Sequence, residues 1–93
     1  MKKTIYKYPL AVIDMNEMML PVGAEILTVQ AVKGDVQLWA LVDPLQESFE
    51  QRYIEIFGTG HPMHCDMGIA RKYISTFQLV GGDFIGHVFE RLN

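Results

Sequence analysis

Residues 57 to 68, FGTGHPMHCDMG, gather the most reactive side chain types of this sequence: two histidines, the only cysteine and an aspartate, with three glycines among them. The segment directly follows a run with the residue pattern of a β-strand. Such a composition suits a metal site, a loop that binds an anion through its backbone, or a plain turn. Each of these hypotheses makes different demands on the rest of the chain.

A metal site would use His61, His64, Cys65 and Asp66, which are residue types that bind zinc. A tetrahedral structural site normally joins two separated ligand pairs from distant segments, whereas these four lie close together in the sequence. His87 is the remaining histidine and could supply a distant ligand. We expect no metal and no other cofactor, and name the low-ranked metal candidates His61, His64 and Cys65.

A nucleophile pair is the second chemical hypothesis, because Cys65 follows His64 directly. A thiolate at neutral pH needs a nearby cation or a helix amino terminus, and adjacent residues of an extended chain point to opposite sides. His61 or His87 could act as the base instead, but nothing in the sequence locates an oxyanion hole. We therefore predict that the protein is not an enzyme.

The GTGH segment, residues 58 to 61, offers backbone amides with little side-chain obstruction and the hydroxyl of Thr59. Glycine-rich turns of this kind can hold a phosphate or a carboxylate. The segment lacks the lysine and the strand–loop–helix context of a P-loop, so a β-turn with glycines at positive φ is the simpler interpretation. An anion pocket would also need the cations near strand ends, which are Arg52, Arg71, Lys72 and Arg91.

The elements that must position these residues are short β-like runs separated by turn residues. A turn is expected at Pro21-Val22-Gly23, with proline at its first central position, and hairpins are expected at Lys33-Gly34-Asp35 and at Gly81-Gly82. Residues 43 to 51 tolerate only a short helical turn or a loop. The expected strands are residues 3–8, 18–20, 25–32, 36–42, 52–58, 72–80 and 83–92.

Two of these strands carry informative side-chain patterns. Residues 36 to 42 are apolar on both faces, with Trp39 and Leu41 opposite the face of Leu38, so this strand is central in its sheet or at an interface. In the last strand, His87 lies among aromatic residues, which is typical of a hydrogen-bonded core or interface histidine. Gly86 in mid-strand indicates a bulge or a close backbone contact.

Together the runs predict one all-β domain over residues 1–93: a small antiparallel β-sandwich or partly open barrel of six to seven short strands, with at most one short helical turn. A chain of 93 residues has room for one core. The mean hydropathy of +0.12 is high for so small a domain. We therefore expect some apolar surface to be buried between subunits of a homo-oligomer.

Charge and composition limit the partners. A net charge of −3 makes long nucleic acid an unlikely ligand, because lysine and arginine supply most of the affinity for phosphates. One cysteine cannot form an internal disulfide. Lys7 and Pro9 interrupt the first segment before an apolar run of signal-peptide length, and no stretch approaches a membrane span. We expect a protein of the host cytoplasm without a membrane partner.

Several segments in order resemble a family of short proteins from tailed phages, prophages and bacteria that is classed as an uncharacterised domain: KTIYKYPL, LPVGAEILTVQ, LWALVD, FGTGHP and YISTFQLVGGDFIGHVFE. The resemblance covers nearly the whole chain and implies a stand-alone phage-type accessory protein. The family pattern includes residues 58–62 and 87–90, whereas the His64-Cys65 pair departs from it, which weakens the metal and nucleophile hypotheses. The tentative ligand-binding residues are therefore Trp39, Gly58, Thr59, Gly60, His61 and His87.

We accordingly expect a non-enzymatic binding protein that contacts a host protein or a small ligand, such as a nucleotide, to counter host defence. For a nucleotide, residues 58–61 would hold phosphate while Trp39, Tyr53 or Phe57 stacked on the base. The alternative is a structural or assembly component of the phage particle, in which exposed strand edges pair between copies. An enzyme would be expected to depend on His61 or His87.

Overall fold

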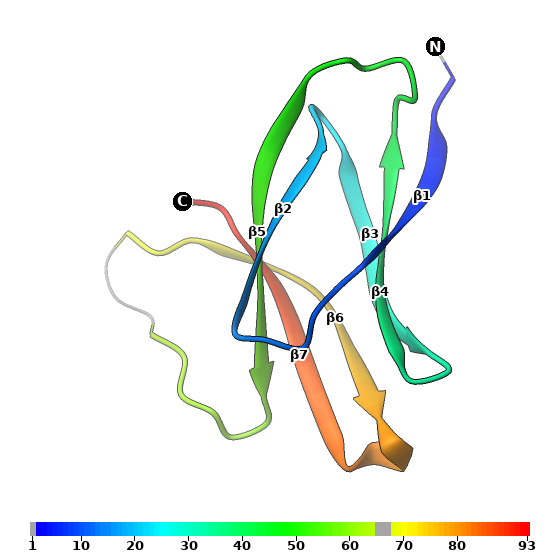
Figure 1. The fold of residues 1–93 in the computed structure, drawn as a ribbon. Coiled ribbons are helices and arrows are strands. Elements are labelled where there is room, and N and C mark those ends of the chain that lie inside the picture. The colour runs from blue at the N-terminus through cyan, green and yellow to red at the C-terminus, as the bar shows by residue number, and fades with distance from the viewer. Residues whose placement is uncertain (1, 65–67) are drawn as a thin grey trace.

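The computed structural model describes residues 2–64 and 68–93, and these form seven antiparallel strands in two sheets. The three-stranded sheet has the order β1-β4-β3 and the four-stranded sheet the order β2-β5-β7-β6 (Figure 1). The two-sheet, all-β architecture confirms the predicted small β-sandwich. The strands are β1 (Thr4–Pro9), β2 (Met15–Pro21), β3 (Glu25–Val32), β4 (Asp35–Val42), β5 (Phe49–Gly58), β6 (Arg71–Leu79) and β7 (Phe84–Arg91).

The tight turns follow from residues that accept a positive φ. Lys33 and Gly34, at φ 53° and 85°, join β3 to β4 in the conformation of a type I′ hairpin, as the sequence predicts. The turn after β2 differs in detail from its prediction. The amide of Ala24 donates to the carbonyl of Pro21 at 3.0 Å, so Pro21 is the first residue of the turn rather than its first central residue.

Two element boundaries also correct the sequence-based expectation. β2 begins at Met15 rather than Met18, because it pairs with β5 from Met15 to Pro21. At the start of β2, the Asn16 side chain accepts from the amide of Ala11 at 3.1 Å and donates to the carbonyl of Ala11 at 2.9 Å, which closes the connecting loop. The second corrected boundary is the start of β5. This strand pairs with β2 as far as Phe49, so it begins at Phe49 rather than at the expected residue 52.

Of the two alternatives expected for residues 43 to 51, the structure has the loop: it contains a β-turn in which the amide of Gln46 donates to the carbonyl of Asp43 at 3.0 Å, and β5 begins at Phe49. Within the described residues, helical geometry occurs as a short 3-10 turn at Val80–Gly82, inside the hairpin between β6 and β7. The last paired residues of that hairpin are Leu79 and Phe84. The connection is therefore four residues long rather than the expected two, although its centre remains at Gly81-Gly82.

The core lies between the inner faces of the two sheets. β4 contributes four buried residues that alternate with less buried neighbours, and β4 is the middle strand of its sheet, as its two-sided apolar pattern indicates. The four-stranded sheet contributes Ile54, Ile56, Phe77 and Val88. The fully or nearly fully buried residues of β4 are Val36, Leu38, Ala40 and Val42.

A single hydroxyl joins the two sheets where β3 runs beside β6. The Ser75 Oγ accepts from the amide of Val29 and donates to the carbonyl of Val29, both at 2.8 Å. Both strands have an irregular register close to this point, between Ile26 and Thr28 and between Tyr73 and Ser75. The serine side chain thus replaces a backbone ladder, and the sandwich stays open rather than closing into a barrel.

We expect Ser75→Ala to lower the free energy of unfolding by about 2 kcal/mol, because it leaves both backbone groups of the fully buried Val29 without this partner. Chemical denaturation followed by tryptophan fluorescence measures the change. Ser48→Ala, at an exposed loop position, is the matched control and should change the stability by less than about 0.5 kcal/mol. Equal stability of the two variants would show that the hydroxyl bridge contributes nothing.

Candidate functional site on the outer face of the four-stranded sheet

The glycine-rich segment after β5 is a β-turn. The amide of His61 donates to the carbonyl of Gly58 at 3.0 Å, and Gly60 has a φ of 87°, as the third residue of a type II turn requires. The His61 ring lies directly over Gly58, since a Cβ built there would be 2.8 Å from the His61 Cε1. Gly58 is therefore needed for close approach, and Gly60 for its backbone conformation.

The described ends of the loop that follows the turn are hydrogen-bonded to neighbouring residues. Arg71, at the start of β6, donates to the carbonyl of His64 at 2.6 Å and to the Glu55 carboxylate at 2.7 Å. Its guanidinium also lies 5.3 Å from the centre of the Phe57 ring, a cation–π arrangement. At the other end of the loop, the amide of Ala70 donates to the Asn93 Oδ1 at 2.8 Å.

A series of hydrogen bonds begins at the turn and connects it to β7 and β6. The Thr59 Oγ1 lies 2.7 Å from the His87 Nε2, and the Thr76 Oγ1 lies 3.1 Å from the His87 Nδ1. The Thr76 hydroxyl is in turn 2.7 Å from the Tyr73 hydroxyl. Hydroxyls both donate and accept, so this chain satisfies either tautomer of the imidazole and also its protonated form.

Aromatic rings adjoin the hydrogen-bonded chain on the same face of the sheet. Phe89 makes edge-to-face contacts with Phe57 and Tyr73, with ring centres 5.9 and 5.4 Å apart. The strand register places Phe57 and Thr76 on either side of His87. Tyr73 is 54% exposed, so the Tyr73 end of the hydrogen-bonded series is accessible to a binding partner. We call this surface the His87 face; it consists of Phe57, Thr59, Tyr73, Thr76, His87 and Phe89.

A hollow of about 290 Å³ adjoins this surface, between the Gly58–His61 turn and the start of β7. Its described lining includes the carboxylate of Asp83 and no arginine or lysine. None of the four cations expected to complete an anion pocket is in this described lining: Arg52 pairs with Glu90, Arg71 and Arg91 pair with Glu55, and Lys72 lines a different hollow. The structure therefore does not assemble the anion pocket that the sequence suggested.

Trp39 is separated from the other expected site residues. It lies on β4 with its side chain on the outer face of the three-stranded sheet, because its neighbours Leu38 and Ala40 point into the core. There it lines a shallow apolar hollow of about 480 Å³. The lining residues define a second surface, the Trp39 face, which consists of Ile5, Leu27, Thr28, Gln30, Val32 and Trp39.

The arrangement corrects the idea of one nucleotide site built from Trp39 and residues 58–61. Both groups lie on outward-facing sides, but of different sheets, so a single small ligand cannot contact both. Thr59 and His87 do come together by a direct hydrogen bond, with His61 beside them in the same turn. Five of the six tentative binding residues thus gather at one end of β5 and β7.

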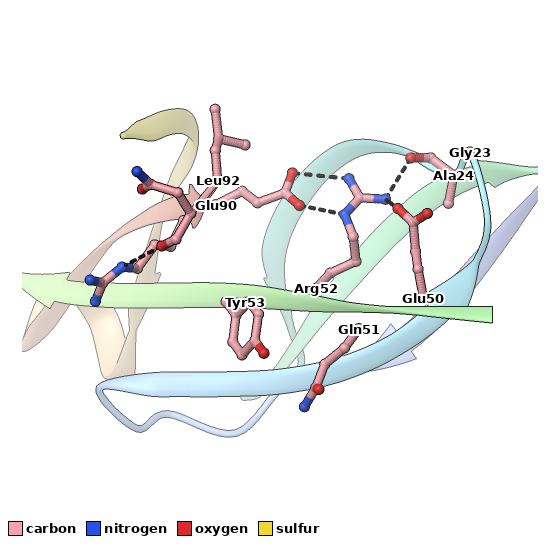
Figure 2. A pocket seen from close by; sticks show the side chains of 10 residues that line it. Gly23, Ala24, Glu50, Gln51, Arg52, Tyr53, Glu90 and Leu92 are labelled. Carbon is pink, nitrogen blue, oxygen red and sulfur yellow. Dashed lines mark hydrogen bonds and ion pairs between the residues drawn. The ribbon is translucent and has the colours of Figure 1, made fainter. Parts of the chain in front are cut away.

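An ion pair that sequence reasoning missed sits between the sheets. The Arg52 Nη2 donates to the Glu90 Oε1 at 3.0 Å, the Arg52 Nε bonds to the Glu90 Oε2, and the Arg52 Nη1 donates to the carbonyl of Ala24 at 2.9 Å. Figure 2 shows the two side chains pointing toward one another, with Glu50 on the far side of the guanidinium. The hydrogen bond to Glu90 raises the pKa of Arg52, although burial opposes the shift.

Two hollows of about 440 and 430 Å³ flank this ion pair. Both are lined by Arg52 and Glu90, which engage each other there, and Glu90 is 7% exposed. In Figure 2, Gln51 and Tyr53 point to the other side of β5. The Arg52–Glu90 pair therefore acts as a structural clamp that joins β5, β7 and the turn at Ala24. Its charged groups are hydrogen-bonded to each other rather than directed at a ligand.

The metal hypothesis concerns residues that the structure describes only in part. His61 and His64 are described, whereas Cys65 and Asp66 lie outside the described residues. Among the described residues, no three His, Cys, Asp or Glu side chains form a group that could hold a metal ion. In the same part of the chain, no helix has the length and apolar character needed to cross a membrane.

Tyr73 and Thr76 belong to the surface around His87, although the sequence analysis did not select them. The hairpin register could have found Thr76, because a hairpin centred on Gly81-Gly82 places Thr76 directly opposite His87, as the structure does. Tyr73 could not be placed in this way. The register shift between Tyr73 and Ser75 changes which β7 residue lies opposite it.

Comparison with known proteins gives one match. A family model described as "Domain of unknown function (DUF7352)" matches residues 1–93. No curated protein and no solved structure matches the chain.

Proposed function

The chain belongs to the DUF7352 family, and we propose that it is a non-enzymatic binding protein whose His87 face contacts a host protein. In this proposal it is a phage-type accessory protein of the host cytoplasm that counters host defence. The likeness of its ordered segments to short proteins of tailed phages and prophages supports the phage origin. The composition of the His87 face supports the binding role and carries the proposal.

This surface has the properties of a protein-binding patch. Aromatic residues supply large contact areas with little loss of side-chain entropy, and tyrosine is enriched among the residues that dominate binding energies. Here Phe89 contacts the ring of Tyr73 edge to face and is itself packed against Phe57, and Thr76 holds the Tyr73 hydroxyl. A rigid, half-exposed tyrosine loses little freedom when a partner binds, so more of the contact energy appears as affinity.

The same geometry favours a protein over a nucleotide as the partner. A nucleotide would need cations near the phosphates, but the described residues around the turn offer the carboxylate of Asp83, and Arg71 forms an ion pair with Glu55.

The geometry around His87 also favours binding over catalysis. Two threonine hydroxyls orient the His87 ring, whereas a histidine that acts as a general base is typically oriented by a carboxylate.

We expect Tyr73→Ala to weaken capture of the host partner at least about tenfold, because truncating a central tyrosine removes contact area and a positioned hydroxyl. The measurement is affinity purification from bacteria that carry active defence systems, followed by a titration with the isolated partner. Tyr6→Ala is the matched control, since Tyr6 is 44% exposed on β1, in the other sheet. A partner that binds both variants equally well would contradict the proposal.

The alternative function, a structural or assembly component of the phage particle, draws support from the exposed apolar surface of the three-stranded sheet. Leu27 is 39% exposed there and Ile5 is 56% exposed. Repeated copies in a particle would cover such a surface. Detection of the protein in purified particles, at a fixed ratio to the other components, would establish this function in place of host-protein binding.

A further inference from the structure

The Trp39 face is apolar where an exposed antiparallel sheet normally carries polar side chains. Sheets with one solvated side usually alternate apolar-in and polar-out residues. Here Trp39 and Leu41 of β4 point outward, and Ile5 of β1 lies opposite Leu41 on the same side. Leu27 occupies the register shift of β3 and lines the same hollow as Trp39. The centre of this surface is therefore suited to contact with another apolar surface.

Opposite charges lie on the two sides of this apolar centre. Lys7 of β1 pairs directly with Trp39, and Glu25 of β3 pairs directly with Leu41, so both side chains point outward with them. Lys7 and Glu25 are exposed, and β4 runs between their strands. The surface is thus positive along β1 and negative along β3.

The size and shape of the chain indicate that a surface remains to be covered. A compact monomer of 10.6 kDa exposes about 5,500 Å², whereas this chain exposes 6114 Å². Its radius of gyration is 13.8 Å, against about 12 Å for a compact domain of this length. The excess area is of the order that each partner buries in a standard protein interface, about 800 Å².

We propose that a second copy of this chain covers the Trp39 face, related to the first by a twofold axis that runs along β4 between the two surfaces. Such a rotation places β1 of each subunit over β3 of the other. Lys7 then approaches the partner's Glu25, and symmetry repeats the contact, while the apolar centres pack against each other. Lys7 and Glu25 are offset by about 7 Å along the strands, which long side chains span.

The Trp39 face is a better contact between copies than the free edge of β1, because the residues on that edge oppose the addition of another strand. Leu10 donates its amide to the carbonyl of Val36 across the β1–β4 pair. By alternation, the backbone groups of Ile5, Lys7 and Pro9 point toward the open edge. An edge lysine and a proline without an amide hydrogen both oppose strand addition. This dimer does not depend on the proposed host contact, which uses the other sheet.

The test is sedimentation velocity over a concentration series of the full chain. We expect a dimer, and we expect Lys7→Glu and Glu25→Lys each to weaken it at least about tenfold, because symmetry introduces every substitution twice. The double variant Lys7→Glu/Glu25→Lys should recover most of the affinity, since it restores both opposite-charge contacts. Leu27→Glu, at an exposed position, should abolish the dimer. Glu17→Lys, an exposed glutamate of β2 on the other sheet, is the charge-matched control.

Four outcomes would overturn the proposal. The wild-type chain could remain monomeric at concentrations up to about 1 mM, which corresponds to an association free energy weaker than about −4 kcal/mol. The single charge reversals could leave the dimer unchanged, or the double variant could fail to restore it. Circular dichroism and thermal unfolding establish that each variant is folded. A folded Leu27→Glu variant that still dimerises would place the contact elsewhere and count against the proposal by itself.

Discussion

Glu90→Ala is expected to lower the free energy of unfolding by about 3 to 5 kcal/mol. The substitution removes both Glu90 oxygens from the Arg52 guanidinium, whose side chain is 16% exposed, and leaves it with the carbonyl of Ala24 and the more exposed carboxylate of Glu50 at 3.5 Å. A domain of this size has a total stability of about 5 to 15 kcal/mol, so the loss is a large fraction of it. Thermal unfolding should show a decrease in Tm of more than about 10 °C.

A matched pair of variants separates the ion pair from the packing around it. Arg52→Met/Glu90→Leu removes both charges together and should recover most of the stability, because apolar residues of similar volume often replace a buried ion pair without loss. Glu17→Ala removes an exposed glutamate of β2 and should change the stability by less than about 0.5 kcal/mol. If Glu90→Ala were as mild as Glu17→Ala, the clamp between β5, β7 and Ala24 would not stabilise the fold.

Gly86→Ala is the second substitution with a large expected effect, about 3 kcal/mol of lost stability. A Cβ at this position would lie 2.5 Å from the Cζ and 2.7 Å from the Cε1 of Phe77, and 3.1 Å from the Cγ2 of Ile56. Phe77 is 1% exposed and belongs to the buried core, so its ring can move away only by displacing neighbouring core side chains. The close backbone contact that the sequence indicates at Gly86 is therefore contact with this aromatic ring.

A double-mutant cycle with Phe77→Leu tests this explanation. The smaller side chain alone costs stability because it leaves a cavity in the core, but in the Gly86→Ala background the added methyl group occupies part of that cavity. We expect the double variant to be more stable than the sum of the two single effects predicts, by at least about 1 kcal/mol. Denaturant titration of the four proteins measures the coupling. Additive effects would show that the Cβ and the ring do not compete for the same space.

The strand pattern was available from sequence wherever local chemistry decides it. Alternation separated the two apolar faces of β4, and glycines placed the hairpin centres at Gly34 and at Gly81-Gly82. These features depend on side-chain direction and on turn geometry, which a short segment specifies by itself. Boundaries that depend on a distant partner were wrong, as for β2, whose first residues are strand because they pair with β5.

The candidate site was predictable only in part, for the same reason. The sequence brings Gly58, Thr59, Gly60 and His61 together in one turn, and the hairpin register could place Thr76 beside His87. Whether the His87 ring would lie next to that turn was decided by the antiparallel pairing of β5 with β7, in which Phe57 lies opposite His87. The contacts of Tyr73 depend in addition on the register shift of β6.

The sequence by itself determined an all-β fold with an acidic charge balance and a strand that is apolar on both faces. Only the tertiary structure decided that Trp39 and the Gly58–His61 turn lie on different sheets, and that Arg52 pairs with Glu90 instead of an anion. The physical reason is that composition and alternation act within a strand, whereas the layering of two sheets depends on contacts between residues far apart in the chain. Those contacts created two separate surfaces, the His87 face and the Trp39 face, where the sequence suggested one.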